Sequence, residues 1–269
     1  MKTMKKILSL SLAIIFTTGL SASIGYATHS WNVYHWARQI NPFTLKLGDN
    51  VSSAWDNYLG ETSTDWSVST ILDTTIVAGG TNPKQCKPTA GQVEVCNSKY
   101  GRNGWLGIAQ IWVSDTHITK GITKMNDTYF NMATYNTPAW RRFVMCQEIG
   151  HTFGLDHQDE NFNNANLGSC MDYTNDPDGG AGGAVSNDPS NEHPNTHDYE
   201  QLGIIYTHTD NTSTISPSFI PPQSAKNING TNHAEWGKAL RMDKQGRPSL
   251  YERDLGNNQK IFTFVLYVE

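Results

Sequence analysis

The segment 147–157, which reads QEIGHTFGLDH, constrains the fold of this chain more than any other. Thr137 followed by Pro138 is a strong helix start, and the helix should stop at Gly154. Positions 147 and 151 then lie one turn apart on the same helix face. Gly154 can take the positive φ that turns a chain sharply after a helix. We therefore expect that turn to bring His157 back toward the helix.

The residues gathered in this way have the composition of a catalytic zinc site. His151 and His157 supply imidazoles, Gln147 is the third candidate ligand, and Glu148 lies beside them. Three protein ligands leave a fourth zinc position for water, whose pKa the metal lowers to ~7 so that a neighbouring carboxylate can accept its proton. The pattern predicts that Gln147, His151 and His157 bind the metal and that Glu148 is catalytic.

Two motifs resemble those of the metzincin metallopeptidases. Segment 147–157 matches their H-E-x-x-H-x-x-G-x-x-H motif at every fixed position except the first, where Gln147 stands in place of His. Segment 169–173, SCMDY, resembles their Met-turn, and Tyr173 resembles a tyrosine that some branches use near the metal. The resemblance covers roughly residues 30–208. It implies a zinc-dependent metalloendopeptidase with one catalytic Zn²⁺, a general base and acid at Glu148, and a second catalytic residue at Tyr173.

Two further segments are similar to the matrixin branch of that clan. Residues 106–112 and 122–126 resemble an edge strand and the strand after it, and residues 198–206 resemble a C-terminal helix. The implied fold is α+β, with a twisted, mostly parallel sheet, an antiparallel edge strand, an active-site helix, a Met-turn and a C-terminal helix. A polypeptide substrate would add to the edge strand along residues 107–112.

Gln147 leaves three interpretations open, because a neutral amide is a weaker zinc ligand than an imidazole. In the first, Gln147 is the third ligand. In the second, His117, His193 or His197 completes the shell. In the third, the site binds metal poorly and the protein is a catalytically weak or inactive secreted binding protein. Glu148 favours an enzyme, since an inactive relative has no chemical use for a carboxylate at that position.

The first 27 residues have the layout of a cleaved secretory signal peptide. Lys2, Lys5 and Lys6 precede an apolar run over 7–16, and small residues lie before a cut after Ala27. The apolar run is shorter than the ~20 residues of a membrane-spanning helix. We therefore expect a secreted protein without a membrane anchor.

The four cysteines of an exported chain are expected to form disulfides. Three pairings are possible. Cys86–Cys96, which closes a short loop, together with Cys146–Cys170 is the pairing we favour. A zinc site made of cysteines is the alternative, but the chain lacks C-x-x-C spacing.

The remaining chain divides into an expected catalytic domain over 28–208, a linker over 209–225 and a β-rich C-terminal segment over 226–269. Strands are expected at 43–47, 71–78, 93–95, 106–113 and 118–125, helices at 50–59 and 198–206, and further strands around 239–242, 249–252 and 261–268. The last of these is a continuous apolar run, as in a buried strand. The C-terminal segment is either a small β unit docked on the catalytic domain or a short accessory module.

The net charge and the aspartate-rich loop bear on two questions: which partners the protein has, and whether it binds Ca²⁺. Without residues 1–27 the chain carries 17 basic and 25 acidic residues, a net charge of −8, which does not favour nucleic acid. A polypeptide substrate and a monomeric protein are expected. Asp176, Asp178 and Asp188 could bind Ca²⁺ through hard oxygens, but aspartate is also common in turns and the spacing is not that of an EF-hand.

Overall fold

The computed structural model describes residues 29–30, 33–180, 185–215 and 231–269. The expected signal peptide, 1–27, lies outside these residues, as does most of the expected linker. Residues 209–215 of that linker pack back onto the start of the chain, where Thr214 donates its amide proton to Ala37 O at 2.9 Å. None of the helices within the described ranges is long and apolar enough to cross a membrane.

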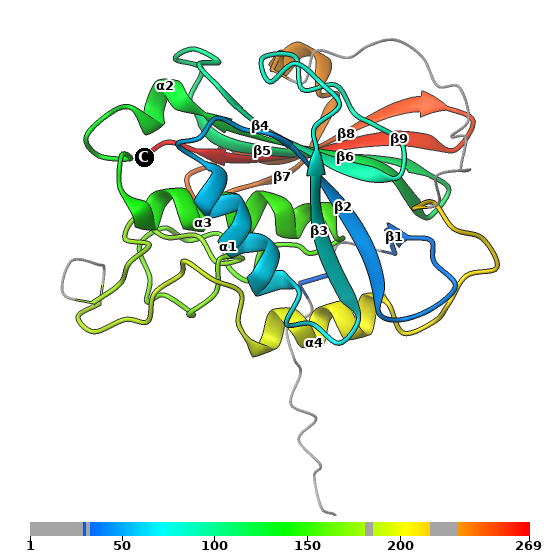
Figure 1. Cartoon of the computed structure of the whole chain (residues 1–269). Helices are drawn as coiled ribbons and strands as arrows, with labels where there is room; N and C mark the ends of the chain where they lie inside the picture. The colour runs from blue at the N-terminus through cyan, green and yellow to red at the C-terminus, as the bar shows by residue number, and fades with distance from the viewer. Residues whose placement is uncertain (1–28, 31–32, 181–184, 216–230) are drawn as a thin grey trace, which may run out of the picture.

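One mixed sheet organises the molecule, with strand order β3-β2-β4-β6-β5-β9-β8-β7 and with β1 (His35–Trp36) paired to β6 (Figure 1). The parallel strands are β2 (Phe43–Asn50), β3 (Leu72–Ala78), β4 (Gln92–Ser98) and β6 (His117–Asn126). β5 (Trp105–Ser114) runs antiparallel to β6. The parallel strands followed by the antiparallel β5 agree with the expected α+β arrangement, but the whole sheet is mixed and not mostly parallel as expected, because β5, β9, β8 and β7 pair in antiparallel fashion.

The C-terminal segment extends this same sheet. β7 (Lys238–Met242), β8 (Pro248–Gly256) and β9 (Gln259–Tyr267) form an antiparallel meander, and β9 pairs with β5 from Trp105 to Ser114. The expectation that β5 is an edge strand is therefore wrong, because β9 takes up its second row of backbone hydrogen bonds. Sequence alone could not reveal this pairing, since the two strands are about 150 positions apart.

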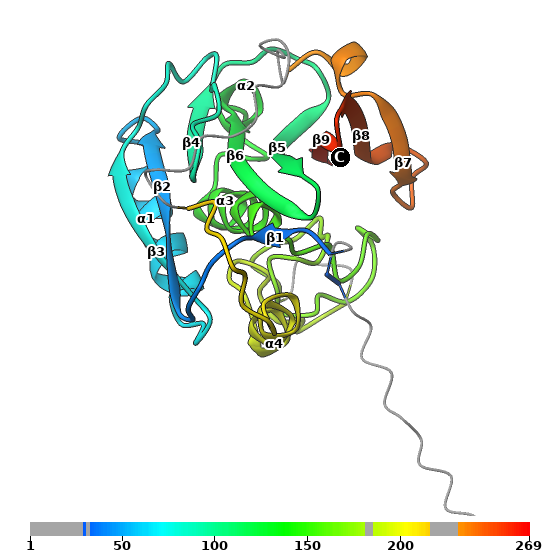
Figure 2. The same ribbon diagram turned by 90° about the vertical axis from the view of Figure 1, so that its right-hand side faces the viewer.

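The helices α1 (Asp56–Trp66), α3 (Pro138–Thr152) and α4 (Thr196–Ile205) lie on the same side of the sheet (Figures 1 and 2). α1 starts and ends later than expected, because β2 runs on to Asn50 and the apolar contacts continue to Trp66 through Leu59. The short α2 (Asp127–Phe130) follows β6, and η1 (His233–Glu235) precedes β7.

The core lies between α1, α3 and the sheet, and β9 contributes to it from one face. Phe262, Phe264 and Leu266 join this core, whereas Val265 and Tyr267 pack in a second cluster with Trp105 and Trp236. Alternate residues of a strand point to opposite faces. β9 is thus apolar on both faces because both are covered, which confirms the buried strand expected near the end of the chain.

Candidate active site

Helix α3 positions the predicted ligands as the sequence pattern requires. Thr137 caps it by accepting the Trp140 amide proton at 3.3 Å, and Phe153 is its C-cap. Gly154 follows with φ +97°, and a Cβ there would lie 2.5 Å from Tyr34 O. Only glycine fits both the backbone angle and the close approach. The chain therefore turns at Gly154 and returns to the helix at His157.

The two predicted histidine ligands meet. Nε2 of His151 lies 2.8 Å from Nε2 of His157. Nδ1 of His151 lies 2.9 Å from Leu155 O, and Nδ1 of His157 lies 2.7 Å from a Glu160 carboxylate oxygen. Because both partners are acceptors, each Nδ1 carries a proton, and the two Nε2 atoms face each other at a distance that requires a proton or a cation between them. A shared cation meets this requirement, and the outer contacts are those that orient metal-binding imidazoles.

Gln147 and Glu148 present further polar atoms that lack partners. Gln147 is fully buried and donates from Nε2 to Cys170 O at 2.9 Å, while its Oε1 has no hydrogen-bond partner among the described residues. Glu148 is 1% exposed, and neither of its carboxylate oxygens has such a partner. Burial raises the pKa of Glu148 well above its ordinary value. Buried oxygens without partners, carried by the same helix as His151, have the chemistry of metal ligands or of groups that bind a metal-bound water.

Gly107 of β5 allows the sheet to approach Glu148. A Cβ at this position would lie 2.3 Å from Glu148 Oε1 and 2.7 Å from a methyl carbon of Val144. The absence of a side chain at position 107 is therefore what lets the helix carry a carboxylate against this strand.

The predicted Met-turn lies directly against α3. Met171 donates its amide proton to the Ser169 hydroxyl at 2.9 Å, and that hydroxyl donates to Asp198 at 2.7 Å. A Cβ on Gly150 would lie 2.6 Å from the sulfur of Met171, so the thioether packs tightly on the helix. The ring of Tyr173 lies 4.4 Å from that of His157. Its hydroxyl donates to Val265 O of β9 at 3.3 Å, and burial raises its pKa well above the usual range.

The C-terminal strands cover this group of residues. Phe264 of β9 stacks on His151, with ring centroids 4.2 Å apart and planes 9° apart. Arg241 of β7 pairs with Asp156 at 2.6 Å and with Glu160 at 3.1 Å. In this conformation β9 is hydrogen-bonded to the strand along which a substrate was expected, residues 107–112, so that placement stays a prediction. The sequence did not predict that Phe264 and Arg241 contact the candidate site. The signal that pointed toward it was the apolar run at 261–268, which indicated a buried strand without saying what it pairs with.

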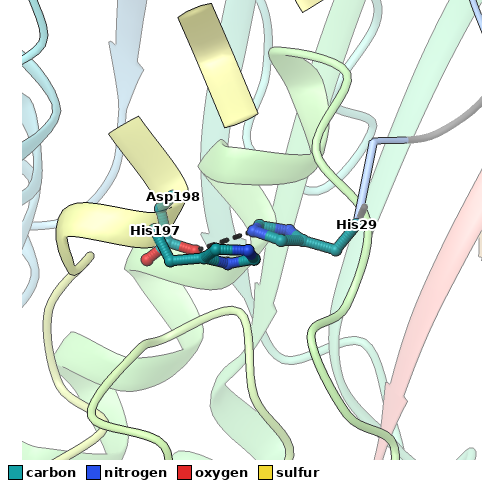
Figure 3. A group of neighbouring side chains, drawn as sticks. All are labelled: His29, His197 and Asp198. Carbon is teal, nitrogen blue, oxygen red and sulfur yellow. Dashed lines mark ion pairs between the residues drawn. The ribbon is translucent and has the colours of Figure 1, made fainter. Parts of the chain in front are cut away.

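The other histidines considered as a third ligand lie elsewhere. His193 bonds Asp65 at 2.7 Å, and His117 lies 3.2 Å from Asp210. His197 packs beside His29, whose Nε2 lies 3.4 Å from Asp198 (Figure 3). Gln147 as the third ligand and a site that binds metal poorly both stay predictions.

Both favoured disulfides are present. Cys86–Cys96 lies on the side of the sheet away from α3, with Trp112 and Ile122, whereas Cys146–Cys170 joins α3 to the Met-turn segment.

Removing the Cys146–Cys170 bridge by two serine substitutions is expected to lower the free energy of unfolding by about 2–4 kcal/mol. If the predicted ligands hold zinc, its affinity should also fall, because Cys170 O accepts a hydrogen bond from the Gln147 amide. Denaturant unfolding and zinc titration measure the two effects. The matched control is the Cys86–Cys96 pair, whose removal should destabilise the fold without changing zinc affinity. Equal zinc affinity in both double variants would contradict a positioning role for the first bridge.

The aspartates considered for calcium do not form a compact ligand group among the described residues. Burial and the neighbouring carboxylates of Asp178 and Asp188 raise the pKa of Asp176. The three acids therefore lie near one another, but calcium stays a sequence-based prediction.

No protein-family model and no curated protein matches the chain. Among solved structures, it is similar to high choriolytic enzyme 1, a hatching enzyme zinc-protease from Oryzias latipes (medaka fish). That likeness has 11% identity and a TM-score of 0.32, and it covers 64% of this chain and 94% of the other. At this TM-score the likeness supports no conclusion about fold or activity.

Proposed function

We propose that this chain is an exported, zinc-dependent endopeptidase of metzincin type whose substrate groove is occupied by its own C-terminal strand. The observation that carries the proposal is the convergence of the His151 and His157 Nε2 atoms, 2.8 Å apart, with His151 on the helix that also holds the buried carboxylate of Glu148. Export belongs to the proposal because the two disulfides suit an oxidising compartment.

The residues that would hold zinc are His151, His157 and Gln147 through its Oε1. Leu155 O and Glu160 keep the two imidazoles in the correct tautomer, and Cys170 O engages the nitrogen of the Gln147 amide. Zinc supplies Lewis acidity, lowering the pKa of a water molecule to ~7 and polarising the scissile carbonyl.

Glu148 is the group that moves the proton. Its carboxylate takes a proton from the attacking water, whose oxygen adds to the carbonyl carbon. As the carbon–nitrogen bond breaks, Glu148 returns the proton to the leaving amine. Burial raises the pKa of Glu148, which makes its carboxylate a stronger base toward the proton of that water.

β9 occupies the place where we propose that the substrate binds. It pairs with β5 in antiparallel register, with Ile108 opposite Val265 and Ala109 opposite Phe264. A bound polypeptide would form the same kind of backbone pairing. Glu148 is 1% exposed while β9 is in place, so turnover requires this strand to leave β5.

A second candidate function is that of a secreted binding protein with a metzincin fold and little or no peptidase activity. The amide at Gln147 and the enclosure of Glu148 favour it. In that case the C-terminal strands would be a permanent part of the sheet.

Zinc content and cleavage of an unfolded protein by the purified mature chain test the proposal. His151→Ala is expected to remove one zinc ion per chain and all cleavage, because it deletes a ligand. Gln147→His is expected to tighten zinc binding, since imidazole replaces a neutral amide. Zinc content unchanged by His151→Ala would overturn the proposal, and affinity unchanged by Gln147→His would remove Gln147 from the ligand set.

A further inference from the structure

Three histidines outside the candidate active site gather around Asp210, near the start of β6. Oδ1 of Asp210 lies 3.3 Å from Nε2 of His35, 3.2 Å from Nε2 of His117 and 3.6 Å from Nε2 of His208. The ligand atoms of His35, His117 and Asp210 all lie within 4.8 Å of one another. Three imidazoles therefore surround one carboxylate oxygen.

These four residues come from three separate parts of the chain. His35 belongs to β1, His117 is the first residue of β6, and the other two follow the end of α4. The rings of His35 and His117 lie edge to face at 5.0 Å, and those of His35 and His208 at 4.8 Å. The fold thus builds the group from distant segments, and the sequence pattern did not reveal it.

The outer contacts orient these groups as they would orient metal ligands. Nδ1 of His35 lies 2.7 Å from Val33 O, which can only accept, so Nδ1 carries the proton and Nε2 turns a lone pair toward Asp210. Arg38 binds the other carboxylate oxygen, Oδ2, at 3.0 Å and leaves Oδ1 for the centre. A lone pair directed at a carboxylate oxygen is repulsive unless a proton or a cation lies between them.

We propose that His35, His117, His208 and Asp210 bind a structural zinc ion. Ligands held at about 2.0–2.1 Å in a zinc tetrahedron lie about 3.3 Å apart, and the three nitrogen–oxygen distances of 3.2–3.6 Å match that edge. Three nitrogen ligands exclude the hard cations Ca²⁺ and Mg²⁺, which take oxygen. His208 lies outside the group whose ligand atoms are all within 4.8 Å of one another, so its ring must turn toward the ion to complete a shell of four protein ligands. With that shell complete, the ion links β1, β6 and the segment after α4 and does no chemistry.

The His29, His197 and Asp198 group lacks this openness (Figure 3). The Gln158 amide lies 2.8 Å from Nδ1 of His197 and donates to Asp198 at 3.1 Å. The other oxygen of Asp198 accepts from Ser169 and from the Asn195 backbone. Hydrogen bonds from neighbouring residues thus occupy both oxygens of Asp198 and Nδ1 of His197, although Nε2 of His29, 3.4 Å from Asp198, has no hydrogen-bond partner among the described residues.

The test uses the full mature chain carrying His151→Ala, which removes the proposed active-site zinc. Any zinc still bound then reports on the Asp210 site alone, independently of whether the proposed function is correct. In this background we expect one bound zinc ion per chain. Zinc at 100 times its Kd should raise the melting temperature by about 5–10 °C. Adding His117→Ala and His208→Ala removes two partly exposed ligands and spares the Asp210–Arg38 ion pair. Zinc affinity should then fall by at least about 100-fold, and the thermal shift should vanish.

The matched control is His193→Ala in the same background. His193 is also about half exposed and bonds the single carboxylate of Asp65, so zinc binding should persist. The proposal is overturned if the His151→Ala chain binds no zinc, or if the triple variant binds it as tightly as the His151→Ala chain does.

Discussion

Glu148→Gln is expected to reduce the rate of peptide-bond cleavage by about 10²–10⁴-fold while leaving the bound zinc in place. The amide has nearly the same shape as the carboxylate but cannot accept and return a proton, and general acid–base groups contribute a factor of this size. The variant should be at least as stable as the parent, because the carboxylate it replaces is buried without a hydrogen-bond partner among the described residues. Hydrolysis of an unfolded protein, zinc content and thermal unfolding measure the three quantities.

The control for this change is Glu192→Gln, which alters a carboxylate that pairs with Arg142 at 2.9 Å. It should leave the cleavage rate and the zinc content unchanged. Cleavage retained by Glu148→Gln would refute the assigned mechanism even if the protein proved to be a zinc peptidase.

Phe264→Ala is expected to increase cleavage by the mature chain while making the fold less stable. Truncating a fully buried phenylalanine lowers the free energy of unfolding by about 3–5 kcal/mol. In Phe264→Ala, part of this loss is the stacking of the phenylalanine ring on His151. If about 3 kcal/mol of that cost falls on the docking of β9, the population with an open groove rises by about 100-fold. The initial rate of cleavage, measured well below the melting temperature, reports this population.

Val265→Ala is the matched control, because this neighbour packs on the other face of the sheet. It should loosen β9 without removing a contact to the histidines, and the rate should rise much less than in Phe264→Ala. Equal rates in the two variants, or a rate no higher than that of the parent, would show that β9 does not control access to Glu148.

Short-range features of the sequence predicted the parts of the site that α3 carries. Three local features were enough: the cap at Thr137, the four-residue spacing from Gln147 to His151, and the glycine at position 154. Each acts within a few turns of chain, so the sequence alone indicates it. The disulfide pairing also agreed with expectation. The ends of α1 were misplaced because polar residues near its C-terminal end concealed a helix that continues to Trp66.

Long-range pairing could not be predicted in the same way. The sequence marked residues 261–268 as a buried strand, but many strands can satisfy an apolar run, and its partner depends on which edge is free in the folded sheet. Side-chain contacts between β5 and β9 form only in the folded sheet; one example is Gln110, which donates to the Thr263 hydroxyl at 2.9 Å. The cluster around Asp210 is similar, since its ligands come from segments more than 80 positions apart.

The sequence by itself determined that a capped helix carries Gln147, Glu148 and His151, and that a glycine turn follows it. Only the tertiary structure decided that His157 completes a pair of facing imidazoles, that β9 covers them, and that Asp210 gathers three more histidines. Helix and turn preferences arise from interactions between near neighbours in the chain. Enclosure and metal-ligand geometry arise when distant segments exclude water together, and no local pattern encodes which segments will meet.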